Sequence, residues 1–166
     1  WGSSSPWLFY GLWVLMGLGI VGIGTSVMHD SNHGSYSNNK LLNSMLGNIL
    51  NILGGYGRTW RIQHNILHHT YTNVDGLDED IQAGVLLRMS PHAPRYRIHK
   101  FQHLYAWLLY ALMNLFWVTV KDFRQVVRYD RDGLLKKEKV SLRTALTELI
   151  LMKLIYVGYV LVVPML

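Results

Sequence analysis

Apolar positions come in long runs rather than in the short alternation of exposed strands. Residues 7–28 contain no charged side chain, and a helix of this length measures about 33 Å, enough to cross a bilayer. Gly17, Gly19, Gly22 and Gly24 lie among large residues, and small residues allow close packing between helices in lipid. The pattern predicts a membrane-spanning helix over about 7–28.

The rest of the chain alternates apolar and basic stretches. The apolar stretch 41–56 is interrupted by asparagines and is short for a span. The apolar, aromatic stretch 104–120 reaches one membrane thickness at most. The last apolar stretch, with Lys153 inside it, predicts a second span. In chain order these segments are apolar 41–56, polar 57–103, apolar 104–120, a basic loop over 121–143 and the span over about 146–166. This organisation predicts an all-α integral membrane protein.

The basic segments restrict the topology of the chain. Positive loops stay on the cytoplasmic side, which places both 57–103 and 121–143 there. The stretch 104–120 would then have to enter and leave on one side. We therefore expect it to lie in or under the interface, with Trp107 and Trp117 as interfacial aromatic residues; a true span that violates the rule is the alternative.

Composition and charge exclude several classes. Half of the residues are hydrophobic and only 16% are charged, against about 25% in soluble domains. This argues against a disordered chain and an ordinary cytosolic enzyme. The net charge of +6 suits nucleic acid or an anionic membrane, and the apolar runs favour the bilayer, so we expect no nucleic-acid partner. Without cysteine, disulfides, Fe–S clusters and thiolate zinc sites within the chain are excluded.

The histidines form two clusters. His29 and His33 make an HxxxH pair directly after the first span, and His64, His68 and His69 make HxxxHH. On an α-helix, residues i and i+4 share a face, whereas His69 turns about 100° from His68 and could reach a second ion or the far side of the same one. Clustered imidazoles favour Fe, Cu or Zn. Histidines with purely structural hydrogen bonds would explain a single HxxxH pair, but they explain two such clusters less well.

Other metal or catalytic sites fit less well. The Glu-x-x-His spacing of carboxylate-bridged helix bundles and the HExxH of zinc proteases are both absent. No GxSxG supports a serine hydrolase. A haem held by two histidines would leave the doublet unexplained.

The sequence segments around both clusters resemble those of a known protein family. HDSNHGSYS at 29–37 and QHNILHHTYTNVDGLDEDI at 63–81 resemble the first and second histidine boxes of membrane fatty acid desaturases, where the second box reads HxxHH or HxxxHH. LRMSPH at 87–92 and HKFQHLYAWLLYAL at 99–112 resemble the bacterial acyl-CoA or acyl-lipid branch, similar to linoleoyl-CoA desaturases of the front-end type. Residues 1–166 would be part of one desaturase domain, with its histidine-box region over 29–103.

The resemblance implies a chemistry and its partners. Two iron ions, held as a di-iron centre at the cytoplasmic face of a multi-pass membrane protein, would use O2 to introduce a cis double bond into an acyl-CoA or an acyl lipid. Electrons would come from a ferredoxin or a small haem protein. A methylene C–H bond has no acidic proton, so the metal and O2 must supply the difficult chemistry.

The resemblance also implies roles for single residues. The expected iron ligands are His29, His33, His64, His68 and His69. Partners expected to accept from a ring N–H are Asp30, Asn65 and Asn73, and Asp30 could equally cap a helix start. Weaker ligand candidates, which form HxxxH without a doublet, are His99 and His103. The acidic loop is expected to be a solvated face made of Asp75, Asp78, Glu79 and Asp80.

The chain departs from the family pattern in two places. No histidine follows His103, so the third histidine box is absent, and the first helix of the usual opening hairpin is missing before Trp1. Five ligands cannot fill two iron shells. We therefore expect a fragment of a longer protein that by itself binds iron weakly or not at all and lacks desaturase activity. Alternatives are a membrane di-iron hydroxylase acting on alkane, sterol or carotenoid, and a non-enzymatic membrane metal- or haem-binding module.

Overall fold

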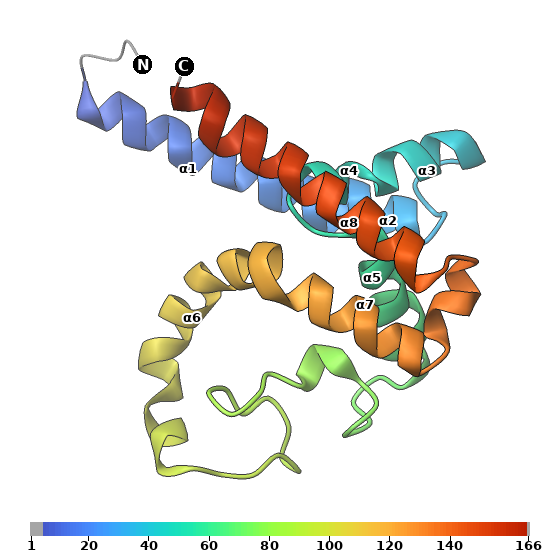
Figure 1. Ribbon diagram of the computed structural model, residues 1–166. Helices are drawn as coiled ribbons and strands as arrows, with labels where there is room; N and C mark the ends of the chain where they lie inside the picture. The colour runs from blue at the N-terminus through green and yellow to red at the C-terminus, as the bar shows by residue number, and fades with distance from the viewer. Residues whose placement is uncertain (1–4, 166) are drawn as a thin grey trace. The chain divides into compact units, whose positions relative to one another are not determined.

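The computed structural model describes residues 5–165 of the chain (Figure 1). Leu166, the end of the second predicted span, and residues 1–4 of the predicted domain lie outside the described residues. The described residues form helices, turns and loops and contain no strand, which confirms the predicted all-α class. The chain divides into two compact units, residues 1–53 and 54–166, and each is described by itself.

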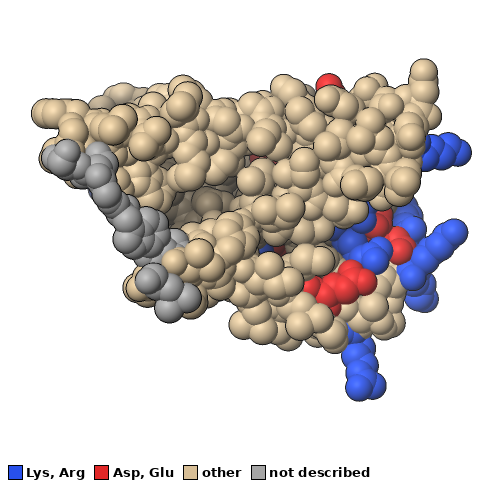
Figure 2. All heavy atoms as spheres, turned by 90° about the horizontal axis from the view of Figure 1, so that it is seen from above, with Lys and Arg blue, Asp and Glu red and all other residues tan. Residues whose placement is uncertain are grey.

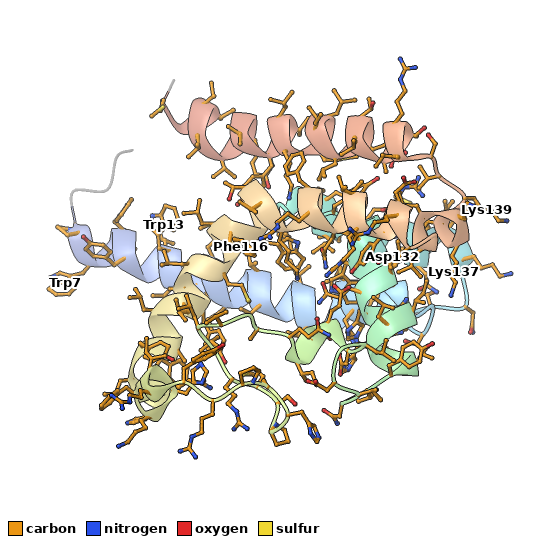
Figure 3. The ribbon with its side chains drawn as sticks, turned by 60° about the horizontal axis from the view of Figure 1, so that its bottom comes forward. Trp7, Trp13, Phe116, Asp132, Lys137 and Lys139 are labelled. Carbon is orange, nitrogen blue, oxygen red and sulfur yellow. The ribbon has the colours of Figure 1, made fainter. Side chains whose placement is uncertain are left out.

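A single long helix dominates the first unit. It runs through α1 (Pro6–Gly22), the π-helical η1 (Ile23–Met28) and α2 (His29–Asn32). Proline is tolerated at the start because the first amides have no intrahelical acceptor. Large apolar side chains are exposed all around α1, as in a helix surrounded by lipid, and Trp7 and Trp13 project from it (Figure 3). This helix is long and apolar enough to cross a membrane and contains the whole predicted span 7–28.

Asparagine side chains make local hydrogen bonds at the start of segment 41–56. Asn39 caps α3 (Lys40–Gly47) by accepting from the amides of Leu41 and Leu42. Asn43 is buried and donates to the Ser37 carbonyl over 2.7 Å. Segment 41–56 forms two short helices, α3 and α4 (Ile49–Ile52), rather than one apolar span.

The second unit contains two long helical stretches and a short helical box segment. Its core is apolar and draws on several elements, as Tyr56, Ile62, Val126, Tyr129, Leu135, Ala145 and Leu149 pack together. The elements, in order, are α5 (Gly57–Arg61), η2 (Ile62–His68), η3 (Glu79–Ile81), η4 (Arg97–Phe101), α6 (Gln102–Phe116), η5 (Trp117–Lys121), α7 (Asp122–Arg131), η6 (Leu134–Glu138), α8 (Leu142–Val157), η7 (Gly158–Val162) and η8 (Val163–Met165).

Two stretches of this unit are also long and apolar enough to cross a membrane. They are Arg97–Arg131, of 35 residues, and Leu142–Val162, of 21 residues. The segment 104–120 thus lies inside a helix whose length would allow a span, and its interfacial placement stays a prediction.

Figure 2 shows uncharged side chains over most of the visible face, with Lys and Arg gathered beside Asp and Glu along one edge.

The prediction of a basic loop over 121–143 is wrong for much of its length. Residues 122–131 form α7, and 134–138 form the 3-10 helix η6. Phe123, Val126 and Tyr129 recur every three residues and pack in or against the core, which is the spacing of one helix face. The many basic residues concealed this period in the sequence. Lys137 and Lys139 project outward after α7 (Figure 3).

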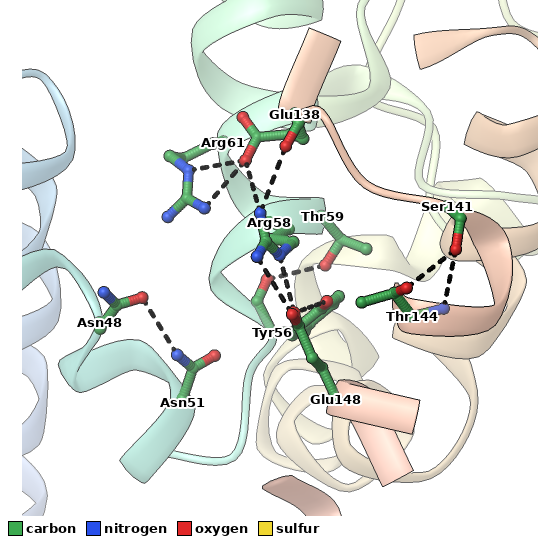
Figure 4. A network of polar contacts seen from close by, with 10 residues as sticks. All are labelled: Asn48, Asn51, Tyr56, Arg58, Thr59, Arg61, Glu138, Ser141, Thr144 and Glu148. Carbon is green, nitrogen blue, oxygen red and sulfur yellow. Dashed lines mark hydrogen bonds and ion pairs between the residues drawn. The ribbon is translucent and has the colours of Figure 1, made fainter. Parts of the chain in front are cut away.

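A polar network fixes α5, the helix directly before the second histidine box (Figure 4). The Arg58 guanidinium binds Glu148 of α8 at both oxygens, over 2.7 and 3.1 Å, and the Tyr56 hydroxyl donates to Glu148 over 2.7 Å. Burial, and then the neighbouring Glu148 carboxylate, raise the pKa of Tyr56, so its hydroxyl stays protonated and donates. Arg61 pairs with Glu138 over 2.9 Å. The network joins α5 to both α8 and η6.

A buried ion pair lies between α7 and α8. Lys153 Nζ is 2.6 Å from Asp122 Oδ2, and the Asp122 side chain is fully buried. Lys153 also donates to the Gly54 carbonyl over 2.5 Å. The Thr59 hydroxyl and the Trp117 indole N–H donate to the other Asp122 oxygen, over 2.8 and 3.0 Å. Every charge of the pair therefore has hydrogen-bond partners, as burial requires.

Gly54 occupies a position that only glycine fits. Its φ is +89°, and an added Cβ would lie 2.8 Å from the Tyr156 ring and 2.9 Å from Val118 Cγ2. We expect Gly54→Ala to lower the free energy of unfolding by about 3 kcal/mol, because backbone strain and overpacking add. Gly133 has a similar φ of +73° but open space around it, so Gly133→Ala should cost only about 1 kcal/mol. Thermal unfolding in detergent compares the two; equal losses would contradict this packing.

Candidate metal centre

The first histidine box ends the long helix of the first unit. The His29 and His33 rings meet edge to face with centroids 4.6 Å apart. Asp30 Oδ1 lies 2.9 Å from His29 Nδ1, and histidines that bind metals commonly have a carboxylate at one ring nitrogen. Because Asp30 lies inside the continuous helix 6–32, it does not cap a helix start. Asp30 thus contacts the His29 ring, and its role in orienting that ring stays a prediction.

The second histidine box lies in the π-helical segment η2. The His64 ring stacks between Trp60 and His68, with centroid distances of 4.5 and 5.3 Å. His64 Nε2 and His69 Nε2 are only 3.3 Å apart. The turn of about 100° expected from α geometry does not describe His69, because the segment before it is π-helical; which ion His69 would reach stays a prediction. A π turn bonds residue i to i+5 and so brings His69 beside His64.

Asp78 is a site residue that the sequence interpretation missed. It was expected on a solvated face, yet its side chain is fully buried and lies 3.0 Å from His68 Nδ1. Its oxygens also accept the amides of Asn73 over 2.8 Å and Asp80 over 3.0 Å. Burial raises the pKa of Asp78, but the hydrogen bonds from Asn73, His68 and Asp80 outweigh burial and lower it overall. A carboxylate that stays ionised is thereby held against the His68 ring.

Asp80 faces the same two rings. Its Oδ2 lies 3.4 Å from His64 Nδ1 and 3.5 Å from His68 Nδ1. Ligand atoms of His64, His68 and Asp80 all lie within 4.8 Å of one another, close enough to hold a metal ion. The two rings are nearly parallel, at 15°, with Asp80 beside the Nδ1 atoms of both, whereas His69 lies beside Nε2 of His64.

The donor set fits iron. Imidazole nitrogens and carboxylate oxygens are the ligands of non-haem iron sites, and histidines that bind metals commonly hold a carboxylate at the other ring nitrogen. His29 and His68 each have such a carboxylate, in Asp30 and Asp78. Clustered rings and acidic partners are therefore present in each unit.

The remaining predicted site residues lie as follows. Asn73 donates its backbone amide to Asp78. Its φ is +63°, a conformation that Asn tolerates better than most residues. Asn65 lies within η2, beside His64. The His99 ring donates to the Val85 carbonyl over 2.9 Å and accepts the Tyr96 amide over 3.1 Å, so it serves the loop backbone.

His103 lines an open hollow of about 720 Å³ together with Arg88, Arg95 and Trp107. Among the described residues, neither His99 nor His103 belongs to a group of ligand atoms close enough to hold a metal. The signal that could have revealed Asp78 and Asp80 is the Asp-x-Asp spacing ten residues after His68, since such a loop can fold back onto the box helix.

Comparison with known sequences adds the decisive observation. The sequence pattern of the fatty acid desaturase family matches residues 5–166. The chain belongs to the fatty acid desaturase family. This confirms the resemblance that the two histidine boxes and their flanking words indicated.

Curated relatives of this desaturase-family chain are acyl-lipid enzymes by name. It is 32% identical to an sn-1 linoleoyl-lipid 6-desaturase of Synechocystis sp. over 92% of the chain and 42% of the relative. It is 34% identical to an acyl-lipid (8-3)-desaturase of Physcomitrium patens over 95% of the chain and 32% of the relative. A linoleoyl-lipid 6-desaturase of Arthrospira platensis is 36% identical over 63% of the chain and 28% of the relative.

The desaturase chain spans less than half the length of these relatives. No solved structure matches it. Family membership therefore rests on the sequence match, and the geometry of the boxes is described from this chain's own residues.

Proposed function

We propose that the full-length protein is a membrane fatty acid desaturase that introduces a cis double bond into an acyl chain with O2 and a di-iron centre. The observation that carries this is the second box, where His64, His68 and His69 converge and carboxylates stand against Nδ1 of the first two. The names of the relatives favour an acyl lipid over an acyl-CoA as the substrate.

The residues that would hold two iron ions are His29, His33, His64, His68 and His69, together with ligands from a third box. Bound iron supplies the activation of O2 that attack on an unactivated C–H bond requires. The protein's part is to hold the imidazoles neutral and oriented. Asp30 and Asp78 accept the Nδ1 protons of His29 and His68, which fixes the tautomer and turns Nε2 toward the metal.

We assign Asp80 the same orienting role. Its Oδ2 contacts the Nδ1 side of His64 and His68, whereas His69 approaches from the Nε2 side of His64. An ion shared by the two Nδ1 atoms and Asp80 would have to displace Asp78 from His68. Orientation by Asp78 and Asp80 would turn the Nε2 side of His64 and His68 toward a bound metal and keeps both carboxylates paired.

The helices suggest where this site lies. His29 lies near the end of the 27-residue apolar helix Pro6–Asn32, which puts the first box where a membrane helix would meet the interface. We propose that this interface is cytoplasmic, because the segments around the second box are basic. An acyl chain could approach from the bilayer, and a ferredoxin or small haem protein would deliver electrons from the aqueous side.

Product analysis tests this function. The full-length gene would be expressed in a host that lacks polyunsaturated lipids, with and without added linoleate, and the acyl chains would be analysed by mass spectrometry. We expect a new cis double bond in lipid-bound chains. A hydroxylated chain would instead support the hydroxylase alternative, and unchanged lipids with bound metal would support the non-enzymatic module.

A further inference from the structure

One carboxylate next to the second box is held by three side chains of α7. Glu79 Oε2 accepts from Arg128 Nη2 over 2.6 Å, from the Tyr129 hydroxyl over 2.8 Å and from Gln125 Nε2 over 3.2 Å. The Glu79 side chain is only 13% exposed, and Gln125 and Tyr129 are buried. The segment around Glu79 is thus fixed to a helix that itself packs into the core.

The same cluster continues to a box histidine through two glutamines. Gln125 Nε2 donates to Gln63 Oε1 over 2.6 Å, and Gln63 Nε2 donates to Asp80 Oδ1 over 2.5 Å. The other oxygen of Asp80 faces His64 Nδ1 over 3.4 Å. An unbroken series of polar contacts therefore leads from α7 to the ring of His64.

This series matters because the acidic segment contains little regular helix. Residues 71–77 are exposed and form turns, and the helical turn that contains Glu79 is only three residues long. Asp78 and Asp80 flank Glu79 directly, so the anchor at Glu79 sets the position of both. Asp78 is also held by the amides of Asn73 and Asp80, so the anchor at Glu79 adds the connection of this turn to α7.

We propose that Gln125, Arg128 and Tyr129 of α7 are positioning residues for the metal centre. They act through Glu79 and Gln63 to hold Asp78 and Asp80 against the Nδ1 atoms of His68 and His64. Their hydrogen bonds reach the rings through Glu79, Gln63 and Asp80, so they act on the rings indirectly. The inference rests on the proposed metal site at the second box.

Removing single hydroxyl groups gives a matched test. Tyr129 and Tyr56 both lie in the same core cluster, and each donates its hydroxyl to a carboxylate, Glu79 over 2.8 Å and Glu148 over 2.7 Å. Only Glu79 belongs to the segment that contacts the box. Tyr129→Phe and Tyr56→Phe therefore remove equivalent hydrogen bonds with different connections, and Glu79→Gln removes the central charge.

The full-length protein and the three variants would be purified in detergent without metal and titrated with Co²⁺. Thermal unfolding would be measured in parallel. We expect Tyr129→Phe and Glu79→Gln to weaken Co²⁺ binding about tenfold, the lower end of the loss for residues that orient metal ligands, and to alter the visible spectrum of the bound Co²⁺. Tyr56→Phe should lose stability while its Co²⁺ affinity and spectrum stay as in the wild type.

Three results would contradict these expectations in different ways. If Tyr129→Phe and Glu79→Gln bind Co²⁺ like the wild type with an unchanged spectrum, the positioning role is overturned. If Tyr56→Phe weakens binding as much as Tyr129→Phe, the effect is general loss of stability, and the role is overturned as well. If the wild-type protein itself binds no Co²⁺, the proposed metal centre has failed, and the inference with it.

Discussion

His68→Ala in the full-length protein should reduce double-bond formation at least about a hundredfold. Its ring lies at the centre of the second box, stacked on His64 and held by the buried Asp78. Loss of a ligand should exceed the 10- to 100-fold loss that follows removal of residues behind the ligands. The truncation also leaves the Asp78 carboxylate buried without its imidazole partner, which is costly. The measurement is the yield of desaturated acyl chains per amount of folded protein.

His103→Ala is the matched control for this experiment. His103 also lies in the second unit, but it lines an open hollow and belongs to no metal-binding group among the described residues. We expect it to retain most of the wild-type yield. Equal losses in both variants, or full activity of His68→Ala, would contradict the assignment of the second box as the metal-binding box.

Lys153→Met should lower the free energy of unfolding by about 3 kcal/mol, because it leaves the buried Asp122 carboxylate without its counter-ion. Met keeps the length and apolar volume of the Lys stem. The double variant Lys153→Met/Asp122→Asn removes both charges and should recover much of this loss, because a buried pair replaced as a whole is often close to neutral. Thermal unfolding in detergent measures both.

A surface pair provides the comparison for Lys153→Met. Arg131 and Asp132 lie 3.6 Å apart with side chains 77% and 46% exposed, so Arg131→Met should change stability by less than about 1 kcal/mol. If Lys153→Met costs no more than Arg131→Met, the ion pair is not buried as described. A double variant no more stable than Lys153→Met would instead show that Asp122 does not carry the penalty.

The parts of this fold that depend on hydrophobicity alone could be predicted from the sequence. Residues 7–28 have no charge to interrupt them, and the structure places them in one long apolar helix. The helix α7 was not predicted because it has few apolar side chains among many charged ones. The hydropathy averaged over the segment therefore hides its apolar face. Its helix becomes evident only when the spacing of Phe123, Val126 and Tyr129 is considered against a core.

The candidate site divides in the same way. The histidines are visible because their spacing carries the signal within a few residues. Asp78 and Asp80 contact box histidines 10 and 16 positions earlier in the chain, and the path of the loop between them depends on contacts with α7 that no local pattern encodes. A run of acidic residues usually faces water. This expectation fails for Asp78 and Asp80 because each accepts a hydrogen bond from an N–H group.

The π-helical box has a consequence for comparing histidine boxes of different length. In HxxxHH the first and last histidines are five residues apart, which is the spacing of a π-helical hydrogen bond and slightly more than one turn. In HxxHH they are four apart, which is close to one turn of an α-helix. Both versions therefore place the outer two histidines on the same face of their helix. An alignment of the two should place its one-residue gap between the first histidine and the doublet, and the extra residue is absorbed as a local widening of the helix, as in η2.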